Sequence, residues 1–500
     1  MTNLGIQVRL RLISHRLFAA RRCRSVTTTT LTAAAHPQIT IHRPEIRCLT
    51  GLRMVAAGWV VLFHFHFTPV PGIAELMAPL RPLVSAGALG VDLFFVLSGF
   101  VITYTYLDVL GPRVDLRAIG RFVWARVCRL WPVYAVVLHL FGIWLLARLV
   151  LGSDDEIAFQ AVQPVISVRE YVQQLLMVQL WDDPYLDGSS WVGPAWSISA
   201  EWLAYLAFPV VALVLFRLRR FPTSLLLLGA VALMTPVGWA YLDTGTPYHP
   251  WSWLTRIACG FASGALAYLA VRRLRPTRRI GWLASVSAVM LAVIIVAGLV
   301  AGDRWAPGRG GAVIALFPLL VAALAMADRG PAMVLATPFA VHGGRISYAL
   351  YLVHIPIFEV YWLAMRRYPW LAPDSVAAHV VGVVALFAPV VVAALAYRWI
   401  EEPARRRLRQ LRLPGRRRTA AAERILEHRR MLTGAEPRHA ATPTRPPTLA
   451  AALIKAQQRR PTHRAGEGRP EWTQVIQQRP DWVESLSEPA PARATTASER

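Results

Sequence analysis

Residues 376–396 read VAAHVVGVVALFAPVVVAALA and contain no Asp, Glu, Lys or Arg. Residues 285–301, SVSAVMLAVIIVAGLVA, are equally free of these charged residues. A helix needs about 20 consecutive, mostly apolar residues to cross the hydrocarbon core of a bilayer. Both stretches therefore predict transmembrane helices. Apolar blocks of similar length elsewhere in the chain can be interpreted in the same way.

About ten such apolar blocks occur along the chain, near 50–68, 87–107, 131–151, 196–216, 223–242, 252–271, 281–301, 310–327, 346–365 and 376–399. Any single block could instead be a buried core helix, but soluble cores do not contain ten of them in succession. The runs are continuous and do not alternate with polar residues, which excludes a transmembrane barrel. We predict an all-α, polytopic integral membrane protein with about ten transmembrane helices.

The composition of the 500 residues agrees with this fold class. Hydrophobic residues make up 55% and charged residues 17%, and the mean hydropathy is +0.40. An ordinary soluble domain has about 25% charged residues, so a soluble globular enzyme is excluded, as is an apolar-poor disordered scaffold. The four cysteines are scattered and form no C-x-x-C pair, which predicts neither a disulfide framework nor a zinc site. They are Cys23, Cys48, Cys128 and Cys259.

The net charge is +25, and within the predicted membrane domain the arginines gather in every second connection between blocks. The basic connections carry Arg113, Arg117, Arg121, Arg126 and Arg129, then Arg217, Arg219 and Arg220, then Arg272, Arg273, Arg275, Arg278 and Arg279, and finally Arg405, Arg406 and Arg407. Residues 152–195, by contrast, are acidic. The positive-inside rule predicts a multi-pass protein of the cell (inner or plasma) membrane with both termini cytoplasmic. Because the arginines flank membrane blocks or lie in a tail, we expect no nucleic-acid partner.

The chain divides into three parts by composition. Residues 1–45 form a basic N-terminal extension, 46–404 the transmembrane domain, and 405–500 an Arg-, Ala- and Pro-rich tail. Both ends are expected to be disordered and cytoplasmic. Within the tail, residues 418–432 are compatible with a short amphipathic helix on anionic lipid, the alternative to a solvated disordered segment.

The first block carries a cation and an imidazole on one face. Arg53 and His64 are 11 residues apart, about three helical turns and roughly 16 Å along the axis. His66 points to a different face. A membrane histidine often only hydrogen bonds between helices, whereas a neutral imidazole in a dry pocket can serve as a general base near pH 7. Both interpretations of His64 are open from the residues alone.

Other ionisable residues also lie in or beside the blocks, where charge is unfavourable and often functional. Asp92 is an intramembrane or interfacial carboxylate, and the small residues Ser98 and Gly99 in the same block permit close helix packing. Arg126 and Arg129 share a helix face at a spacing of three residues. They either anchor the topology or form a clamp for a polyanion, because arginine binds phosphate in a bidentate way.

Polar stripes recur on three later blocks. Glu201 belongs to a stripe with Ser197 and Tyr205 at i, i+4 and i+8. The sixth block carries Arg256, and the ninth carries Ser347, Tyr351 and His354 on one face. Polar stripes on several separate helices predict a wet internal cavity. We expect the carboxylate of Asp92 or Glu201 either to orient an imidazole or to hold a buried arginine.

Taken together these blocks resemble the acyltransferase family 3 membrane proteins, which include polysaccharide O-acetylases and macrolide O-acyltransferases. The resemblance covers about 45–405 and rests on seven elements in the family's order: Arg53-x10-His64, GVDLFFVLSGF at 90–100, Arg126-x-x-Arg129 followed by Pro132-x-Tyr134, WSISAE at 196–201, Arg256-x-x-x-Gly260-Phe, ISYALYLVH at 346–354, and Glu402-Pro403. The residues after 404 lack a Gly-Asp-Ser motif, so the hydrolase-like second domain of some relatives is not expected.

The resemblance implies an O-acyltransferase with acyl-CoA as cytoplasmic donor, acetyl-CoA being expected, and no metal. His64 matches the family's essential histidine, Arg53 its partner, and Arg126 and Arg129 the pair linked to donor binding. Asp92 and Glu201 complete the expected catalytic set, with Ser98, Arg256, Ser347, Tyr351 and His354 lining the pocket. Membrane lipid surrounds the domain, and the acceptor is a hydroxyl of a sugar, glycan or macrolide. The rival hypothesis is a transporter or flippase for a glycan or lipid-linked substrate, which ten spans and intramembrane charges fit equally well.

Overall fold

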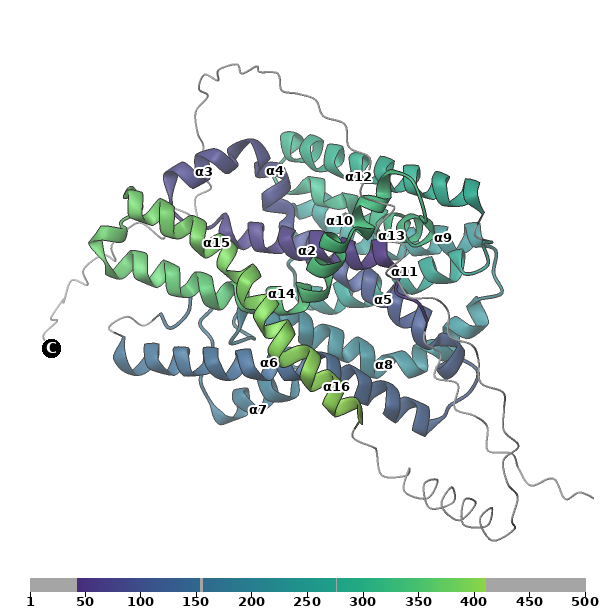
Figure 1. Cartoon of the computed structure of the whole chain (residues 1–500), viewed down its shortest axis with the longest axis horizontal. Coiled ribbons are helices and arrows are strands. Elements are labelled where there is room, and N and C mark those ends of the chain that lie inside the picture. The colour runs from purple at the N-terminus through teal and green to yellow at the C-terminus, as the bar shows by residue number, and fades with distance from the viewer. Residues whose placement is uncertain (1–42, 153–155, 276, 411–500) are drawn as a thin grey trace, which may run out of the picture. The chain divides into compact units, whose positions relative to one another are not determined.

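The computed structural model describes residues 43–152, 156–275 and 277–410, and this part of the chain is helical without a strand. It contains ten helical segments long and apolar enough to cross a membrane, which confirms the predicted fold class (Figure 1). They are α2 (Arg47–Phe65), α3 to α5 (Pro71–Leu110), α6 (Leu116–Leu151), η3 with α8 (Gly193–Leu218), α9 with α10 (Thr223–Thr244), α11 (Ser252–Val271), α12 (Arg278–Trp305), η4 with α13 (Arg309–Met326), α14 (Pro338–Arg367) and α15 to α16 (Val376–Gln410).

Several of these segments are composite. The second combines α3 (Pro71–Met77), η1 (Ala78–Leu80), α4 (Arg81–Val84), η2 (Ser85–Ala88) and α5 (Leu89–Leu110). The fourth, fifth and eighth contain α8 (Trp196–Leu218), α9 (Thr223–Leu233), α10 (Thr235–Thr244) and α13 (Phe317–Met326). A short helix, α7 (Val168–Leu176), lies in the acidic connection, and η5 (Pro331–Ala336) precedes α14. Breaks at Pro- and Gly-containing turns thus leave the number of expected crossings unchanged.

The third crossing begins earlier than the hydropathy predicts. We expected it near 131–151, but α6 begins at Leu116 and runs for 36 residues, about 54 Å. Asp115 caps it by accepting hydrogen bonds from the backbone amides of Arg117 and Ala118. Four of the five arginines assigned to a connection are therefore helical, and only Arg113 lies outside α6. Arg126 and Arg129 consequently occupy a rigid element that can hold them in place.

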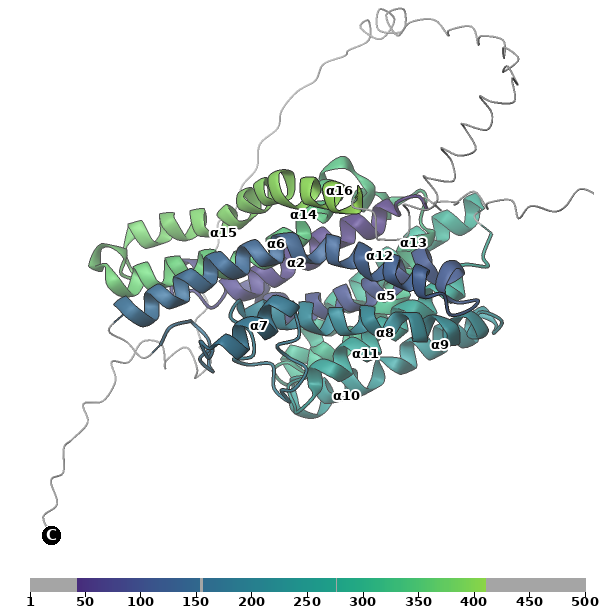
Figure 2. The ribbon, with the colours of Figure 1, turned by 90° about the horizontal axis from the view of Figure 1, so that it is seen from below.

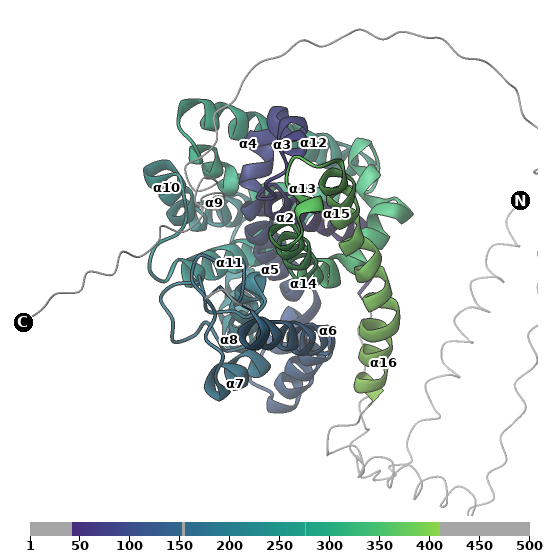
Figure 3. The ribbon, with the colours of Figure 1, turned by 90° about the vertical axis from the view of Figure 1, so that its left-hand side faces the viewer.

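The polar helices lie at the centre of the bundle and the most apolar ones at its edge. α2 packs along α14, and α5 packs along α11. Viewed along the bundle, α2, α5 and α14 lie inside the ring of other helices (Figure 3). In α12 and in the α15–α16 segment only 22% of the most apolar window is buried within the protein. Lipid is the natural solvent for those two helices, while the central ones can carry polar groups.

Small residues allow α5 and α11 to pack at backbone distance. A side chain added at Gly99 would collide with the backbone carbonyl of Phe261, and one added at Gly264 would collide with that of Val96. Packing of this kind is the usual way in which membrane helices associate, because lipid gives no hydrophobic drive between them. The close contact fixes the rotation of both helices and hence the direction of their buried polar side chains.

We expect Gly99→Ala to destabilise the protein by about 1–3 kcal/mol, because backbone rather than a flexible side chain blocks the new methyl group. The loss would appear as a lower melting temperature of the detergent-solubilised protein, followed by size-exclusion chromatography after heating. Gly58→Ala is the matched control, since nothing lies within 4 Å of the added atom. Equal melting temperatures for the two variants would contradict the packing argument.

The last crossing ends in a change of helix type. α15 (Val376–Ala396) passes into η7, a π-helical turn at Tyr397–Glu401, and then into α16 (Glu402–Gln410). α16 lies across α6 (Figure 2), where the Trp124 indole donates to the carbonyl of Leu408 over 3.1 Å. The helix therefore extends past the boundary expected at 404. The rest of the tail from 411, including 418–432, and the extension before residue 43 lie outside the described residues.

Candidate active site

Seven of the predicted site residues line one cavity of about 250 Å³, which we call the arginine cavity. They come from five helices: Arg53 from α2, Ser98 from α5, Arg126 and Arg129 from α6, Glu201 from α8, and Ser347 and Tyr351 from α14. Arg405 and Arg409 of α16 also line it, as do Phe94, Tyr205 and Tyr348. The internal cavity predicted from polar stripes is therefore present between these helices.

The described lining of the arginine cavity is strongly cationic. Its five arginines face a single carboxylate, that of Glu201. Arg53 has no hydrogen-bond or ion-pair partner among the described residues. Arg126 donates to the Tyr106 hydroxyl over 3.0 Å and lies 5.7 Å above the ring of Tyr205. Cations without counter-ions in a cavity are suited to an anionic ligand.

Two of the five arginines have carboxylate partners outside the cavity lining: Arg129 is paired with Glu401, and Arg405 with Glu402. Glu401 is fully buried, whereas Arg129 is 19% exposed. The π turn at Tyr397–Glu401 ends on this carboxylate, and such turns are frequent at functional sites. Sequence reasoning identified the neighbouring Glu402-Pro403 but missed Glu401, since no local pattern predicts a π turn. The ion pair joins the last crossing to α6 at the cavity wall.

Glu201 is held by a hydroxyl network. The Tyr205 hydroxyl donates to Glu201 Oε1 over 2.5 Å and lies 3.1 Å from Ser98 Oγ. Because Tyr205 uses its proton on the carboxylate, the Ser98 hydroxyl is the donor in the second bond. Ser197, the third member of the predicted stripe, instead lies 2.7 Å from the Tyr351 hydroxyl. The stripe thus links α8 to both α5 and α14.

A second cavity, of about 490 Å³, adjoins the arginine cavity. The two share Arg53, Arg129 and Arg405 in their linings. The second cavity also contains Glu45, Arg345 and Arg406. Arg345 donates to Glu45 over 2.7 Å, and this hydrogen bond holds the pKa of the Glu45 carboxyl below its usual value. The arginine cavity is therefore continuous with a basic vestibule at this end of the bundle.

The two predicted histidines, His64 of α2 and His354 of α14, contact one another outside the arginine cavity. Nδ1 of His64 lies 3.1 Å from Nε2 of His354 and 3.0 Å from the carbonyl of Val60. Nδ1 of His354 lies 3.2 Å from the carbonyl of Leu350. Because carbonyls only accept, His354 carries its proton on Nδ1, and its Nε2 accepts from His64 Nδ1. Neutral His64 is thereby left with a lone pair on Nε2, which has no partner among the described residues.

Tyr351 connects the histidine pair to the arginine cavity. It lines the cavity, and its ring centroid lies 5.9 Å from that of His354 and 6.3 Å from that of Phe94. On α2, Arg53 lines the cavity while His64 lies three turns further along. His66 follows the end of α2 and contacts Phe67 at a ring distance of 5.1 Å. The structure therefore places the imidazoles and the arginines at successive levels of one bundle, with aromatic rings between them.

Asp92 and Arg256 form a buried ion pair. Arg256 Nε donates to Asp92 Oδ1 over 2.9 Å, and Nη2 donates to Oδ2 over 2.8 Å. Their side chains are 0% and 1% exposed, and neither lines the arginine cavity. Of the two alternatives for Asp92, the geometry corresponds to holding a buried arginine rather than orienting an imidazole. The guanidinium also lies 5.0 Å above the Trp196 ring at the start of α8.

The described part of the chain contains no group of three His, Cys, Asp or Glu side chains arranged to hold a metal ion. Sequence reasoning missed Tyr348, Arg405 and Arg409 as lining residues. In the sequence, Arg405 and Arg409 belong to the start of the basic tail. They reach the cavity only because α16 packs against α6.

In a comparison with known proteins, residues 46–398 match the family model described as an acyltransferase domain. "Acyltransferase MdmB" of Streptomyces mycarofaciens is 27% identical over 166 residues, which is 32% of this chain and 38% of that protein. A Staphylococcus aureus (strain COL) protein named "Putative O-acetyltransferase" is 24% identical over 373 residues, 72% of this chain and 57% of that protein. The chain thus covers less than two thirds of either relative. No solved structure matches it.

Proposed function

This chain belongs to the acyltransferase family 3 proteins, and from that premise we propose that it is a membrane O-acyltransferase that uses acyl-CoA, expected to be acetyl-CoA. The acceptor is a hydroxyl of a carbohydrate or of a glycosylated natural product such as a macrolide. The single observation that carries the proposal is a cationic cavity connected through Tyr351 to a histidine whose outer nitrogen is free to take a proton.

Donor binding is assigned to the arginine cavity. Coenzyme A carries several phosphate charges, and arginine forks bind phosphate oxygens in a bidentate way. Arg53 and Arg126 are the best candidates, because Arg53 has no partner and Arg126 has only a neutral one, Tyr106. Arg129 adds charge but is held by Glu401. The basic vestibule would admit the nucleotide, and the alternating arginines of the sequence support a cytoplasmic position for this end of the protein.

His64 is assigned as the general base. Its Nε2 takes the proton of the acceptor hydroxyl while that oxygen attacks the thioester carbonyl. The new C–O bond forms as the C–S bond breaks, and the departing CoA sulfur takes the proton back from the imidazolium. His354 and the Val60 carbonyl keep the other proton of His64 on Nδ1, which preserves the reactive tautomer.

The remaining residues position these two centres. Asp92 fixes Arg256 between α5 and α11, and Glu201 fixes Tyr205 and Ser98 at the cavity wall. Arg53 and His64 are about 16 Å apart along α2, so the thioester arm of the donor has to pass Tyr351 and Phe94. The acceptor would then approach from the end of the bundle opposite the arginines. We place the protein in the inner or plasma membrane with both termini cytoplasmic.

Arg126→Gln is expected to weaken CoA binding by about 10- to 100-fold, because a charge-assisted hydrogen bond contributes roughly 1.5–3 kcal/mol. Calorimetric titration of the purified, detergent-solubilised full chain with CoA measures this without knowledge of the acceptor. Arg117→Gln is the matched control, since Arg117 lies exposed on the same helix and outside the cavity. Equal CoA affinity for the two variants would reject the donor site.

The rival transporter hypothesis predicts a different result in the same preparation. An acyltransferase turns over radiolabelled acetyl-CoA in detergent, releasing CoA with transfer to an acceptor or to water. A transporter leaves the thioester intact under these conditions. Absence of CoA release in the presence of membrane glycans from a deletion strain would therefore favour the transporter.

A further inference from the structure

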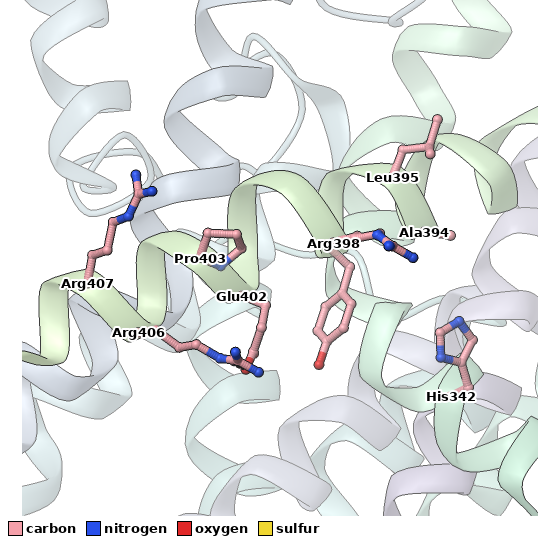
Figure 4. A pocket seen from close by; sticks show the side chains of 9 residues that line it. His342, Ala394, Leu395, Arg398, Glu402, Pro403, Arg406 and Arg407 are labelled. Atoms are coloured by element: carbon pink, nitrogen blue, oxygen red, sulfur yellow. Dashed lines mark hydrogen bonds and ion pairs between the residues drawn. The ribbon is translucent and has the colours of Figure 1, made fainter.

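A third cavity lies where the last crossing ends, away from the histidine pair. We call it the π-turn cavity; its volume is about 870 Å³. It is formed by the start of α14, the end of α15, the π turn and α16, and its lining includes His342, Leu395, Arg398, Glu402, Arg406 and Arg407. Figure 4 shows His342 and Arg398 on one side of this cavity and the Glu402–Arg406 pair on another. Glu402 and Arg406 also line the basic vestibule, whereas His342, Arg398 and Arg407 have no part in the proposed acyl transfer.

The charge of the π-turn cavity is positive and only partly compensated. Glu402 accepts hydrogen bonds from Arg405 and, over 2.7 Å, from Arg406. Arg398 and Arg407 have no hydrogen-bond or ion-pair partner among the described residues. The cavity therefore offers two unpaired guanidinium groups, together with the imidazole of His342, to an anion. Guanidinium groups in this state favour a phosphate group.

An exposed apolar track leads along α15 directly to this basic cavity. Its members are Val380, Val384, Phe387, Val391 and Leu395, which are between 39% and 62% exposed. They recur every three or four residues and so form one stripe about 22 Å long. Leu395 at its end lines the cavity, and Trp399, 66% exposed, follows in the π turn. Tryptophan next to arginine at the end of an apolar helix is typical of the membrane–water interface.

We propose that the π-turn cavity binds the phosphate head group of an anionic phospholipid, whose acyl chains lie along the exposed stripe of α15. The juxtaposition favours a lipid over a soluble phosphate, because the apolar track would contribute nothing to the binding of a small anion. It favours an anionic head group over a zwitterionic one. The carboxylate of Glu402 in the cavity lining is already paired with Arg405 and Arg406, so it is not free to bind a choline, whereas two guanidinium groups are free to bind a phosphate. Its two unpaired arginines, Arg398 and Arg407, line neither the arginine cavity nor the basic vestibule.

The test compares lipid retention by the full chain and by its variants. The protein is purified in detergent with phosphatidylglycerol, and the bound lipid is titrated by native mass spectrometry. The double substitution Arg398→Gln/Arg407→Gln is expected to weaken phosphatidylglycerol binding about 30-fold, as expected for two interfacial charges. Phosphatidylcholine binding should be weak in the unchanged protein and unaffected by the substitutions.

Two further variants separate the proposal from general effects of charge or folding. Arg275→Gln/Arg279→Gln removes two exposed arginines elsewhere and should leave phosphatidylglycerol binding unchanged. Val391→Asn keeps every arginine but interrupts the apolar stripe, and it should weaken binding severalfold. Unchanged binding in the Arg398/Arg407 variant, or equal losses in it and in the Arg275/Arg279 control, would overturn the proposal.

Competition distinguishes the possible sources of the phosphate. Inorganic phosphate or CoA at millimolar concentration should not displace phosphatidylglycerol. If inorganic phosphate displaces it, the cavity is a soluble-anion site and the lipid assignment is wrong. If CoA displaces it through Arg398 and Arg407, the cavity belongs to the donor site and the assignment is equally wrong. Neither result depends on acyl-transfer activity, so failure here leaves the proposed function to its own test.

Discussion

Replacing His64 by alanine is expected to lower acyl transfer by about 10²- to 10⁴-fold, the usual contribution of a general base. The reason is that Nε2 of His64 is the free nitrogen of a fixed tautomer, and alanine leaves nothing to take the hydroxyl proton. The measurement is transfer of labelled acetyl from acetyl-CoA into the membrane and glycan fractions of a deletion strain. CoA affinity should remain unchanged, because His64 does not line the arginine cavity.

Two neighbouring histidines provide the controls. His66→Ala should retain activity, since His66 lies beyond the end of α2 and takes no part in the contact between His64 and His354. His354→Asn should lose less than His64→Ala, because the Val60 carbonyl still accepts the Nδ1 proton of His64. Near-normal transfer by His64→Ala, with intact protein in the membrane, would reject the assignment. Loss in His66→Ala alone would move the role of base to that residue.

Asp92→Asn is expected to destabilise the protein by about 3–5 kcal/mol, the usual effect of removing one partner of a buried ion pair. Asp92 and Arg256 are almost completely buried, so the substitution leaves a guanidinium without a counter-charge inside the bundle. The expected observation is loss of the monodisperse folded protein in detergent, with a much lower melting temperature by size-exclusion chromatography after heating.

A second ion pair, between α5 and the residue that directly follows α11, is the matched control. Asp108 and Arg272 lie 3.2 Å apart and are 33% and 21% exposed. Asp108→Asn should change stability by no more than about 1 kcal/mol, since solvent screens partly exposed pairs. The double substitution Asp92→Leu/Arg256→Met should recover much of the lost stability, because neither charge then stays buried. If Asp92→Asn and Asp108→Asn lowered the stability equally, the buried Asp92–Arg256 pair would contribute no more to the packing of α5 against α11 than the partly exposed pair.

Much of the fold could be read along the chain. A transmembrane helix satisfies its backbone hydrogen bonds internally, so its existence depends only on the length and polarity of one local segment. The charge-free run at 376–396 and the block containing Arg53 and His64 therefore predicted helices α15 and α2 without knowledge of their neighbours. The start of α6 was missed because its first turns are basic. Hydropathy detects the part in lipid, whereas Asp115 and good helix-forming residues determine where the helix begins.

The order of residues along the chain was enough to predict the class of protein, the ten crossings and most of the polar residues that face inward. The partners of these residues follow from the fold alone: Asp92 with Arg256, Arg129 with Glu401, and His64 with His354. The members of each pair are between 164 and 290 residues apart in the sequence, and each pair depends on the rotation and depth of two packed helices. Small contacts such as Gly99 against Phe261, and a π turn before α16, set that rotation. Local hydrophobicity makes a helix, but packing between helices decides which of its polar groups meet.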